Sequence, residues 1–496
     1  MRSSIARKKS YTPAIKLKDE GLFRQQAYIN GQWVAAKGAA IDVFNPATDG
    51  LLGTVPNLGA AETRIAIKAA RMAWDVWRAV PAEERCAILR KWAALQTEHL
   101  DDLCRILTSE QGKPYDQARS EITSGIGYVE WMAEEGRRVY GDVIPPDNSG
   151  QRLVTYKQPV GVCAMITPWN FPSSMITRKS APALAAGCTV VIKPSELTPF
   201  SALALAELAA RAGIPKGVFN IVTGDPQPIG KEMTDNIHVR KLSFTGSTAV
   251  GKTLMAQCAP TVKKVSLELG GNAPFIVFDD ADLSLAVPAA IASKFRNAGQ
   301  TCICANRIFV QEGIYDKFAM KFTAAVKAMK IGNGLESKVD VGPMINMKGL
   351  EKVERHLQDA VEHGAKLMTG GKRHAKGKTF FEPTVLKGAT PQMQCFREET
   401  FGPLAPLFKF KTEAEAIKLA NDTSYGLAAY FFTRDTARIW RVSEALEYGM
   451  VGANSISIAT PQAPFGGWKH SGIGKEGSKY GIEDYLEIKL VAHGGL

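Results

Sequence analysis

At 496 residues the chain exceeds what one hydrophobic core usually supports, so we expect about three domains. Hydrophobic residues make up 45% of the chain and charged residues 22%, as in ordinary soluble globular proteins. The longest apolar run, Ala181 to Ile192, is too short to span a bilayer, and the net charge of +12 is spread without a dense basic stripe. We therefore expect neither a membrane span nor a nucleic-acid partner.

Cysteine and histidine usage argues against a disulfide framework and against a metal centre. The eight cysteines are scattered, which suits a reducing compartment and predicts a cytoplasmic location. The seven histidines form no ligand-spaced cluster, so we predict no catalytic metal. The first nine residues carry four basic residues and no acid, but they lack a clear amphipathic pattern, and we interpret them as a disordered tail rather than a targeting segment.

The N-terminal part predicts a hairpin followed by helices. Residues 27 to 34 form the hairpin, with Asn30-Gly31 at its turn. The hydrophobic period is helical from Ala61 to about Gly112 and again from Asp116 to Val139. After a break at 141–150, an alternating strand covers Arg152 to Lys157.

The next part is the most regular. Helical or turn-rich segments, such as Ser201–Ala212, separate four short apolar runs, Gly161–Thr167, Thr189–Lys193, Val218–Thr223 and Lys241–Phe244. This alternation predicts a doubly wound α/β fold with a parallel sheet, whose ligands bind at the carboxyl ends of the strands.

A second α/β pattern begins after Gly271. It starts with a strand at Ala273–Phe278 and continues with helices at Ile314–Lys330, Gly349–Gly364 and Thr412–Leu419. The last run, Tyr485–His493, alternates like an edge strand, and an unpaired edge at a terminus invites pairing with another subunit.

Cys302 lies in a polar turn, residues 297–306, between a helical segment ending at Phe295 and the strand-like run Arg307–Val310. A cysteine in such a turn is easily exposed, as a nucleophilic thiolate must be. The alternative is a small buried hydrophobe, the commoner role of a free cysteine.

Glu268 stands between two leucines of an alternating run. A solvated strand face is the simpler interpretation. The Gly270-Gly271 pair that follows indicates a close backbone approach, which suits a pocket wall. A partly buried carboxylate at that position could act as a general base.

Two glycine-rich segments suggest phosphate binding. Gly246 to Thr253 matches the Walker A spacing, which raises a nucleotide hydrolase as an alternative, but no strand before the loop ends in the Asp needed to hold Mg²⁺. The strands that precede the loop end in Thr167, Lys193 and Thr223. A dinucleotide pyrophosphate would fit the same turn. Gly472 to Gly477 spells GxGxxG without a preceding strand, and we interpret it as a turn.

Six motifs in order resemble the aldehyde dehydrogenase superfamily from about Leu17 to Leu496. They are Thr167-Pro-Trp-Asn-Phe-Pro172, Phe244-Thr-Gly-Ser247, Leu267-Glu-Leu-Gly-Gly271, Gly299-Gln-Thr-Cys302, Glu399-Thr-Phe-Gly-Pro403 and Pro464-Phe-Gly-Gly467. The resemblance implies an NAD(P)-binding domain at 1–138 and 161–270, a catalytic domain at 271–477, and a strand arm at 139–160 and 478–496 for homo-oligomerisation as a dimer or tetramer.

The resemblance also implies the chemistry. Cys302 would be the nucleophile that forms a thiohemiacetal and then a thioester, and the Asn170 amide would hold the oxyanion. Glu268 would activate the hydrolytic water, and Lys179 would steady the Asn170 region.

The implied cofactor is NAD, with NADP tolerated. Glu196 would face the adenosine ribose, where a carboxylate repels a 2′-phosphate. The residues implied in cofactor binding are Thr167, Pro168, Trp169, Lys193, Ser195, Glu196, Gly224, Phe244, Gly246, Ser247, Gly251, Leu269, Glu399 and Phe401.

Within the superfamily, the likeness is strongest to succinate-semialdehyde dehydrogenases. It implies an acidic aldehyde substrate, bound by Arg178 and Arg296 beside Phe465. One departure is Ile458-Ala459-Thr460, where an Ile-Ser pair is usual, so Ser457 or Thr460 would have to replace the serine hydroxyl. Glutarate semialdehyde and 2-oxoglutarate semialdehyde stay open as alternative substrates.

Overall fold

The computed structural model describes residues 15–36 and 38–495. The basic segment at residues 2–9 lies outside the described residues, so its interpretation as a tail stays a prediction. Within the described ranges, no helix has both the length and the apolar character needed to cross a membrane. The same ranges hold no group of three or more His, Cys, Asp or Glu residues that could bind a metal ion.

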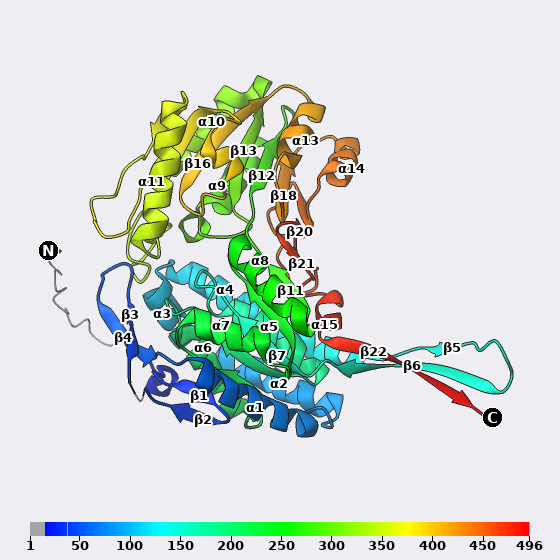
Figure 1. Cartoon of the computed structure of the whole chain (residues 1–496). Helices are drawn as coiled ribbons and strands as arrows, with labels where there is room; N and C mark the ends of the chain where they lie inside the picture. Colours follow the sequence, from blue (N-terminus) through cyan, green and yellow to red (C-terminus); the bar gives the residue numbers. More distant parts are fainter. Residues whose placement is uncertain (1–14, 37, 496) are drawn as a thin grey trace.

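An eight-stranded sheet forms one half of the molecule, the lower half in Figure 1, in the order β2-β1-β9-β8-β7-β10-β11-β21. The strands from β9 to β11 run parallel, whereas β1 and β21 run antiparallel to their neighbours. The strands are β1 (Ala27–Ile29), β2 (Gln32–Val34), β7 (Val162–Ile166), β8 (Thr189–Lys193), β9 (Phe219–Ile221), β10 (Val239–Thr245), β11 (Lys264–Glu268) and β21 (Gly472–Ile473).

Helices cover both faces of this sheet. One face packs against α1 (Ala60–Trp77), α7 (Pro226–Asp235) and α8 (Thr248–Cys258), and the other against α2 (Ala82–Glu98), α3 (Leu100–Gln111), α4 (Tyr115–Glu135), α5 (Ser174–Ala186) and α6 (Phe200–Ala212). The apolar run of β8 serves both cores, because Val190 and Ile192 belong to one cluster and Val191 to the other. This arrangement confirms the predicted doubly wound fold.

The helical stretch predicted from Ala61 to Gly112 is three helices rather than one. Pro81 stands immediately before α2, where its fixed φ suits a helix start, and His99 separates α2 from α3. The helical spacing of apolar residues continues across these breaks because each of the three helices buries one face. The Asn30-Gly31 turn joins β1 and β2, as predicted, and both residues have positive φ.

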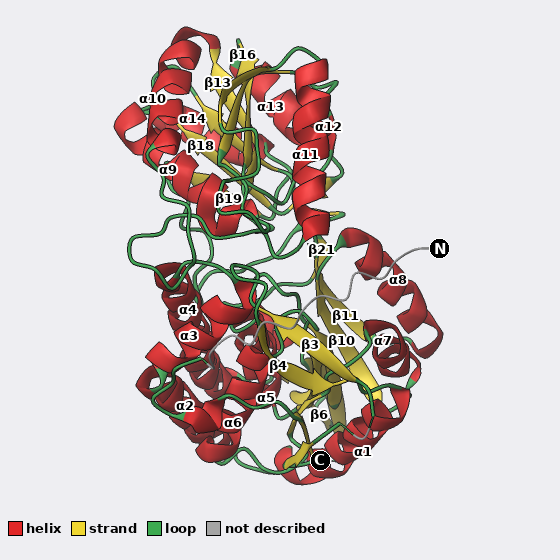
Figure 2. Ribbon diagram, turned by 90° about the vertical axis from the view of Figure 1, so that its left-hand side faces the viewer, coloured by secondary structure: helices red, strands yellow, loops and turns green. Residues whose placement is uncertain are grey.

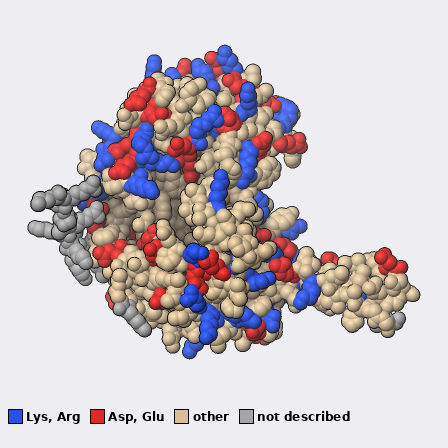
Figure 3. All heavy atoms as spheres, viewed as in Figure 1, with Lys and Arg blue, Asp and Glu red and all other residues tan. Residues whose placement is uncertain are grey.

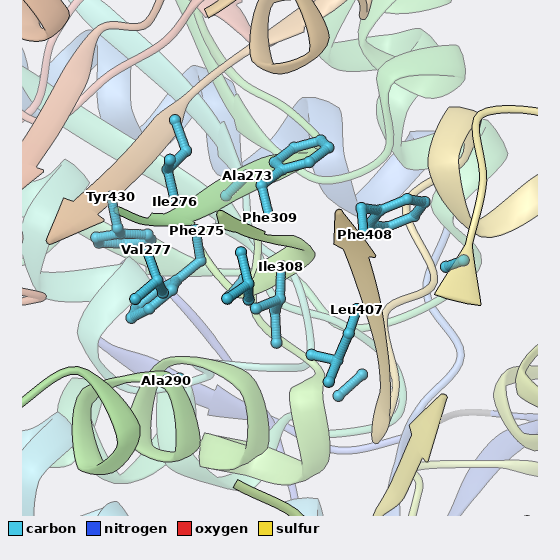
Figure 4. Close-up of a cluster of buried hydrophobic side chains, with 14 of the residues drawn as sticks. Ala273, Phe275, Ile276, Val277, Ala290, Ile308, Phe309, Leu407, Phe408 and Tyr430 are labelled. Atoms are coloured by element: carbon cyan, nitrogen blue, oxygen red, sulfur yellow. The ribbon is translucent and has the colours of Figure 1, made fainter. Parts of the chain in front are cut away.

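A second sheet, of seven strands, forms the other half, in the order β14-β15-β16-β13-β12-β18-β19. Its strands are β12 (Ala273–Val277), β13 (Ala305–Gln311), β14 (Lys366–Thr369), β15 (Thr384–Ala389), β16 (Leu404–Phe410), β18 (Ala428–Phe432) and β19 (Met450–Ala453). Its helices are α9 (Leu283–Phe295), α10 (Tyr315–Lys327), α11 (Met347–Glu362), α12 (Gln394–Arg397), α13 (Glu413–Asn421) and α14 (Thr436–Ala445). Figure 4 shows its core, where Phe275, Ile308 and Leu407 from neighbouring strands lie together above α9.

A three-stranded sheet projects from the body as an arm (Figure 1). It consists of β5 (Val143–Ile144), β6 (Gln151–Pro159) and the edge strand β22 (Leu486–Gly494), which follows α15 (Tyr480–Glu483). In Figure 3 the arm shows few charges, whereas acidic and basic side chains are interspersed over the rest of that face.

The remaining elements are short. The strands are β3 (Ala40–Phe44), β4 (Leu51–Pro56), β17 (Tyr425–Gly426) and β20 (Trp468–Lys469), and the 3₁₀ turns are η1 (Glu20–Leu22), η2 (Gly136–Arg138), η3 (Ala259–Thr261), η4 (Arg296–Gly299) and η5 (Glu312–Ile314). Figure 2 shows that the two large sheets are separated by a zone of loops. The predicted catalytic residues gather there.

Candidate active site

A kinked turn carries Cys302 from the end of α9 to β13. Asn297 and Ala298 adopt left-handed backbone conformations, with φ of 51° and 55°. The turn packs tightly on the Gly-Gly segment after β11, because a Cβ added to Gly271 would lie 2.2 Å from the Cys302 carbonyl oxygen. The close backbone approach expected at this glycine pair is therefore an approach to Cys302.

The Cys302 thiol is partly buried. Burial raises its pKa to about 12, and the carboxylates of Glu399 and Glu268 act in the same direction. The resting side chain is therefore a neutral thiol that needs a base or a nearby positive charge to become nucleophilic. Cys304, two residues later, is buried, and its Sγ lies 3.4 Å from Lys294 Nζ.

Asn170 is held from several sides at the end of β7. Its Nδ2 donates to the Gln300 carbonyl at 3.0 Å, and its own carbonyl accepts from Asn297 Nδ2 at 3.1 Å. The same carbonyl accepts from Lys113 Nζ at 2.7 Å, and Lys113 in turn pairs with the buried Glu121 at 2.6 Å.

The lysine that contacts Asn170 is Lys113, whereas the contacts of Lys179 lie elsewhere, so the role expected for Lys179 stays a prediction. The Lys179 ammonium instead donates to Ser243 Oγ at 3.0 Å and to Glu476 Oε1 at 2.7 Å. Lys113 and Asn170 are 57 residues apart in the sequence, and no local pattern relates them.

Glu268 is the last residue of β11 and is only 4% exposed, so the solvated-face interpretation is wrong. Burial, and then the charge of Glu476, raises its pKa well above the usual range. Its Oε2 has no hydrogen-bond partner among the described residues. A buried carboxyl group with a raised pKa binds a proton more readily than an exposed one, as a general base must.

Glu476 is a site residue that sequence reasoning missed. It lies in the GxGxxG segment, which contains the short strand β21 as well as a turn and pairs with β11 beside Glu268. Glu476 is 7% exposed and lies 2.7 Å from Lys179 Nζ and 3.0 Å from Arg178 Nη2. Its partners are 297 and 298 residues away, so only the fold reveals the cluster.

A cavity of about 270 Å³ extends from Cys302 along the ends of β10 and β11. Most of its wall comes from residues implied in cofactor binding, namely Pro168, Trp169, Gly246, Ser247, Leu269, Glu399 and Phe401. Asn170, Thr245 and Lys352 also line it. Lys352 was not predicted, and it contacts the Glu399 carbonyl.

The other implied cofactor residues do not line this cavity. Thr167, Lys193, Ser195 and Glu196 follow the ends of β7 and β8, and Lys193 Nζ lies 2.7 Å from Glu196 Oε2. Phe244, Gly224 and Gly251 are packing positions, since a Cβ on Gly251 would meet Leu269 at 2.4 Å and one on Gly224 would meet the Leu58 backbone at 2.1 Å.

A second cavity, of about 60 Å³, lies on the other side of Cys302. Arg178, Arg296 and Phe465 line it, as the resemblance implied, together with Ser124 and Glu121. Ser457 is not among its lining residues in the described chain, and the position that reaches the cavity is Ala459. Cys302 and Met175 line both cavities, so the Cys302 thiol lies at their junction.

The profile described as "Aldehyde dehydrogenase family" matches residues 33–491. The chain belongs to this family. It is 60% identical to the succinate-semialdehyde dehydrogenase [NADP(+)] of Escherichia coli (strain K12), over 97% of this chain and 100% of that one. It is 59% identical to a glutarate-semialdehyde dehydrogenase of Pseudomonas aeruginosa, over 97% of this chain and 100% of that one.

The crystal structure of succinate-semialdehyde dehydrogenase from Burkholderia pseudomallei superposes with a TM-score of 0.96 at 60% identity, covering 96% of this chain and 99% of that one. The resemblance read from the six motifs is confirmed. The nucleotide-hydrolase alternative finds no support, and the Gly246–Thr253 loop instead starts α8 at the wall of the cavity beside Cys302.

Proposed function

We propose that the protein oxidises a small aldehyde that carries a carboxylate, most directly succinate semialdehyde to succinate, with NAD(P) as the electron acceptor. The observation that carries the proposal is the small cavity beside Cys302, which two arginines, Arg178 and Arg296, line. A guanidinium binds a carboxylate better than an ammonium does. The names of the relatives from E. coli and B. pseudomallei support the same substrate.

The residues of the larger cavity fit a dinucleotide. Ser247 caps α8, and Gly246 and Ser247 line the cavity, so a helix N-terminus that suits a pyrophosphate lies at its wall. The buried hydroxyls of Thr167 and Thr245 have no hydrogen-bond partner in the described chain, as expected of groups that contact a ligand. Glu399 and Lys352 would hold the end nearest Cys302. Bound NAD(P) would supply the two-electron acceptor for the oxidation.

The chain's own residues account for the acyl chemistry. Cys302 Sγ would attack the aldehyde carbon and form a thiohemiacetal. The Asn170 amide, held by Gln300 and Lys113, would donate to the oxyanion, and such preorganised donors contribute about 3 kcal/mol each. After oxidation to the thioester, Glu268 would take a proton from the attacking water and release the acid.

NAD is the proposed preferred cofactor, and NADP would be tolerated. Glu196 lies at the end of β8, and its carboxylate would repel a 2′-phosphate, whereas its partner Lys193 would offset part of that repulsion. The E. coli relative is named for NADP(+), so a preference for NAD would distinguish this chain from that relative.

Glutarate semialdehyde is the second candidate substrate. Ala459 lines the carboxylate cavity where a serine was expected, and its smaller side chain leaves room for one more methylene. The P. aeruginosa relative named for that substrate is 59% identical.

Steady-state kinetics over a series of ω-oxo acids with three to six carbons tests the substrate. The proposal expects the highest kcat/KM at four or five carbons, and Arg296→Met should raise KM for these acids but not for butanal. Equal kcat/KM for butanal and succinate semialdehyde in the wild type would contradict it.

The wider organisation is proposed as well. Residues 1–138 and 161–270 would form the cofactor domain, 271–477 the catalytic domain, and 139–160 with 478–496 the oligomerisation arm. Ile488 and Leu490 on the edge strand β22 are 70% and 58% exposed, which supports burial against another copy in a dimer or tetramer. Eight free cysteines support a cytoplasmic location.

A further inference from the structure

Two serine residues of the smaller cavity have hydroxyls without a hydrogen-bond partner in the described chain. Ser124 of α4 and Ser174 of α5 both line this cavity. Ser124 is partly buried and Ser174 is 3% exposed, and neither hydroxyl bonds to another group within the residues that the structure describes. Because buried hydroxyls are nearly always hydrogen-bonded, two unpartnered ones at a cavity indicate a ligand that accepts from them.

Other serines of the same two helices satisfy their hydroxyls locally. Ser120 Oγ donates to the Asp116 carbonyl at 2.9 Å in α4, and Ser180 Oγ donates to the Ile176 carbonyl at 2.7 Å in α5. A serine within a helix commonly donates in this way to the carbonyl four residues earlier. Ser124 has the Ser120 carbonyl at that position and does not bond to it, so its hydroxyl stays available at the cavity.

A glycine brings the two cavity serines together. A Cβ added to Gly125 would lie 2.8 Å from Thr177 Oγ1 and 3.3 Å from the Cα of Ser174, so α4 and α5 are in direct contact at this position. Ser124 immediately precedes the glycine. The two serines therefore meet the cavity from neighbouring helices at one helix contact.

This serine pair lies beside a residue proposed to hold the substrate carboxylate. Arg178 follows Ser174 by four residues on α5, and residues at this spacing share a helix face. Tyr128 follows Ser124 by four residues on α4, and the Arg178 guanidinium carbon lies 4.7 Å from the centre of the tyrosine ring. An oxygen on the carbon next to a carboxylate bound by Arg178 would thus lie close to the serines.

The acid that lines the same cavity does not compete for these hydroxyls. Glu121 Oε2 accepts from Lys113 Nζ at 2.6 Å, and Oε1 accepts from the backbone N–H groups of Ser173 and Ser174 at 3.0 and 3.1 Å. Both carboxylate oxygens already have donors. Ala459, which also lines the cavity, has no polar side-chain atom. The two serine hydroxyls are therefore left to donate to a substrate.

We propose that Ser124 and Ser174 donate hydrogen bonds to an oxo oxygen on the carbon next to the substrate carboxylate, so that 2-oxoglutarate semialdehyde is preferred to glutarate semialdehyde. A methylene at that carbon shields both hydroxyls from water and offers no acceptor, and a site built to bond a polar group rejects the analogue that lacks it. The inference rests on the proposed function, because it needs an acidic aldehyde whose carboxylate is held by Arg178 and Arg296.

The experiment compares three aldehydes with the same chain length, namely 2-oxoglutarate semialdehyde, glutarate semialdehyde and pentanal. Steady-state kinetics with saturating NAD gives kcat/KM for each. We expect the wild type to prefer the 2-oxo acid to glutarate semialdehyde by about 10²-fold, or about tenfold for each hydrogen bond. Equal kcat/KM for the two acids in the wild type would overturn the proposal, whatever the variants show.

Three variants separate the oxo oxygen from the carboxylate as the acceptor. Ser124→Ala and Ser174→Ala should each lower the preference for the 2-oxo acid about tenfold, and the double variant should abolish it. Ser120→Ala is the matched control, because its hydroxyl bonds within the same helix and the residue does not line the cavity. Equal losses with both acids in the two cavity variants would show that the hydroxyls bind the carboxylate, and would overturn the proposal.

Inhibition by 2-oxobutyrate and by butyrate tests the same hydroxyls without turnover. As competitors of the aldehyde, 2-oxobutyrate should bind about tenfold or more tightly than butyrate to the wild type, and equally well to the double variant. Failure of the proposed function looks different, because kcat/KM would then be no higher for the acids than for pentanal. In that case the two inhibitors decide the inference, and equal inhibition constants in the wild type would overturn it.

Discussion

Gly271 and Cys302 are in backbone contact, and a Cβ on Gly271 would lie 2.2 Å from the Cys302 carbonyl oxygen. The glycine pair after Glu268 therefore brings Glu268 and Cys302, the proposed general base and the proposed nucleophile, to the same wall of the site. Since the φ of Gly271 is not positive, the requirement for glycine is steric rather than conformational.

Gly271→Ala should displace the Cys302 turn, because backbone oxygen cannot move away as a flexible side chain can. We expect kcat/KM for the aldehyde to fall about 10²-fold, as for an ångström-scale misplacement of a reacting group. NAD affinity and the melting temperature should change far less than kcat. Gly213→Ala is a control for glycine loss, because a Cβ there meets nothing within 4 Å, although its φ of +97° costs some stability. Equal activity losses in the two variants would contradict a specific role for the Gly271 contact.

Lys113→Met should lower both stability and turnover. It leaves Glu121 buried without its cation, which costs about 3–5 kcal/mol, and it removes the donor that holds the Asn170 carbonyl. In the double variant Lys113→Met with Glu121→Gln the stability should partly return, since the amide oxygen of the introduced glutamine would still accept from the Ser173 and Ser174 backbone N–H groups. Turnover should stay low. Recovery of turnover together with stability, measured by thermal melting and kcat, would show that Lys113 does not act through Asn170.

Cys302 should react slowly with iodoacetamide in the free enzyme and faster as the pH rises. Burial raises its pKa to about 12, so the thiolate fraction below that pH grows about tenfold per unit. Bound NAD⁺ carries a positive nicotinamide ring and should shift the alkylation profile to lower pH, which reduced cofactor should not do. A profile with a midpoint near an ordinary thiol pKa in the free enzyme would refute the buried neutral thiol.

Glu196→Ser should change cofactor choice. Removal of the carboxylate beside Lys193 frees the ammonium for a 2′-phosphate, so kcat/KM with NADP should rise relative to NAD by about tenfold or more. The check is the ratio of kcat/KM for the two cofactors in wild type and variant. A wild type that prefers NADP, or an unchanged ratio, would show that Glu196 does not distinguish the cofactors.

Each residue that could be predicted from the sequence lies in a recognisable local pattern. Cys302 lies in a Gly-Gln-Thr-Cys turn, Glu268 precedes two glycines, and the alternation of β8 with α6 predicts the doubly wound sheet. Lys113 and Glu476 have no such signal. Each is defined by a partner brought close only in the folded chain, and a buried charge cannot be told from a surface charge without that partner.

The two arginines of the smaller cavity illustrate the same limit. The sequence, through the family resemblance, predicted that Arg178 and Arg296 bind the substrate carboxylate, and both line the cavity beside Cys302. It could not show that Arg178 is already paired with Glu476, or that Ala459 rather than Ser457 reaches the cavity. In the irregular segment before Phe465, packing sets the direction of each side chain. Such a segment leaves no periodic hydrophobic pattern in the sequence from which that direction could be predicted.

The most direct test of the account is a single-turnover experiment with succinate semialdehyde and NAD on Cys302→Ala, Cys304→Ala and Glu268→Gln, with the reduced cofactor followed by absorbance and the acyl-enzyme by mass spectrometry. We expect no burst and no adduct in Cys302→Ala, a normal burst in Cys304→Ala, and a full burst with a persistent thioester in Glu268→Gln. A burst in Cys302→Ala, or an adduct on Cys304 in the wild type, would contradict the assignment of Cys302 as the nucleophile.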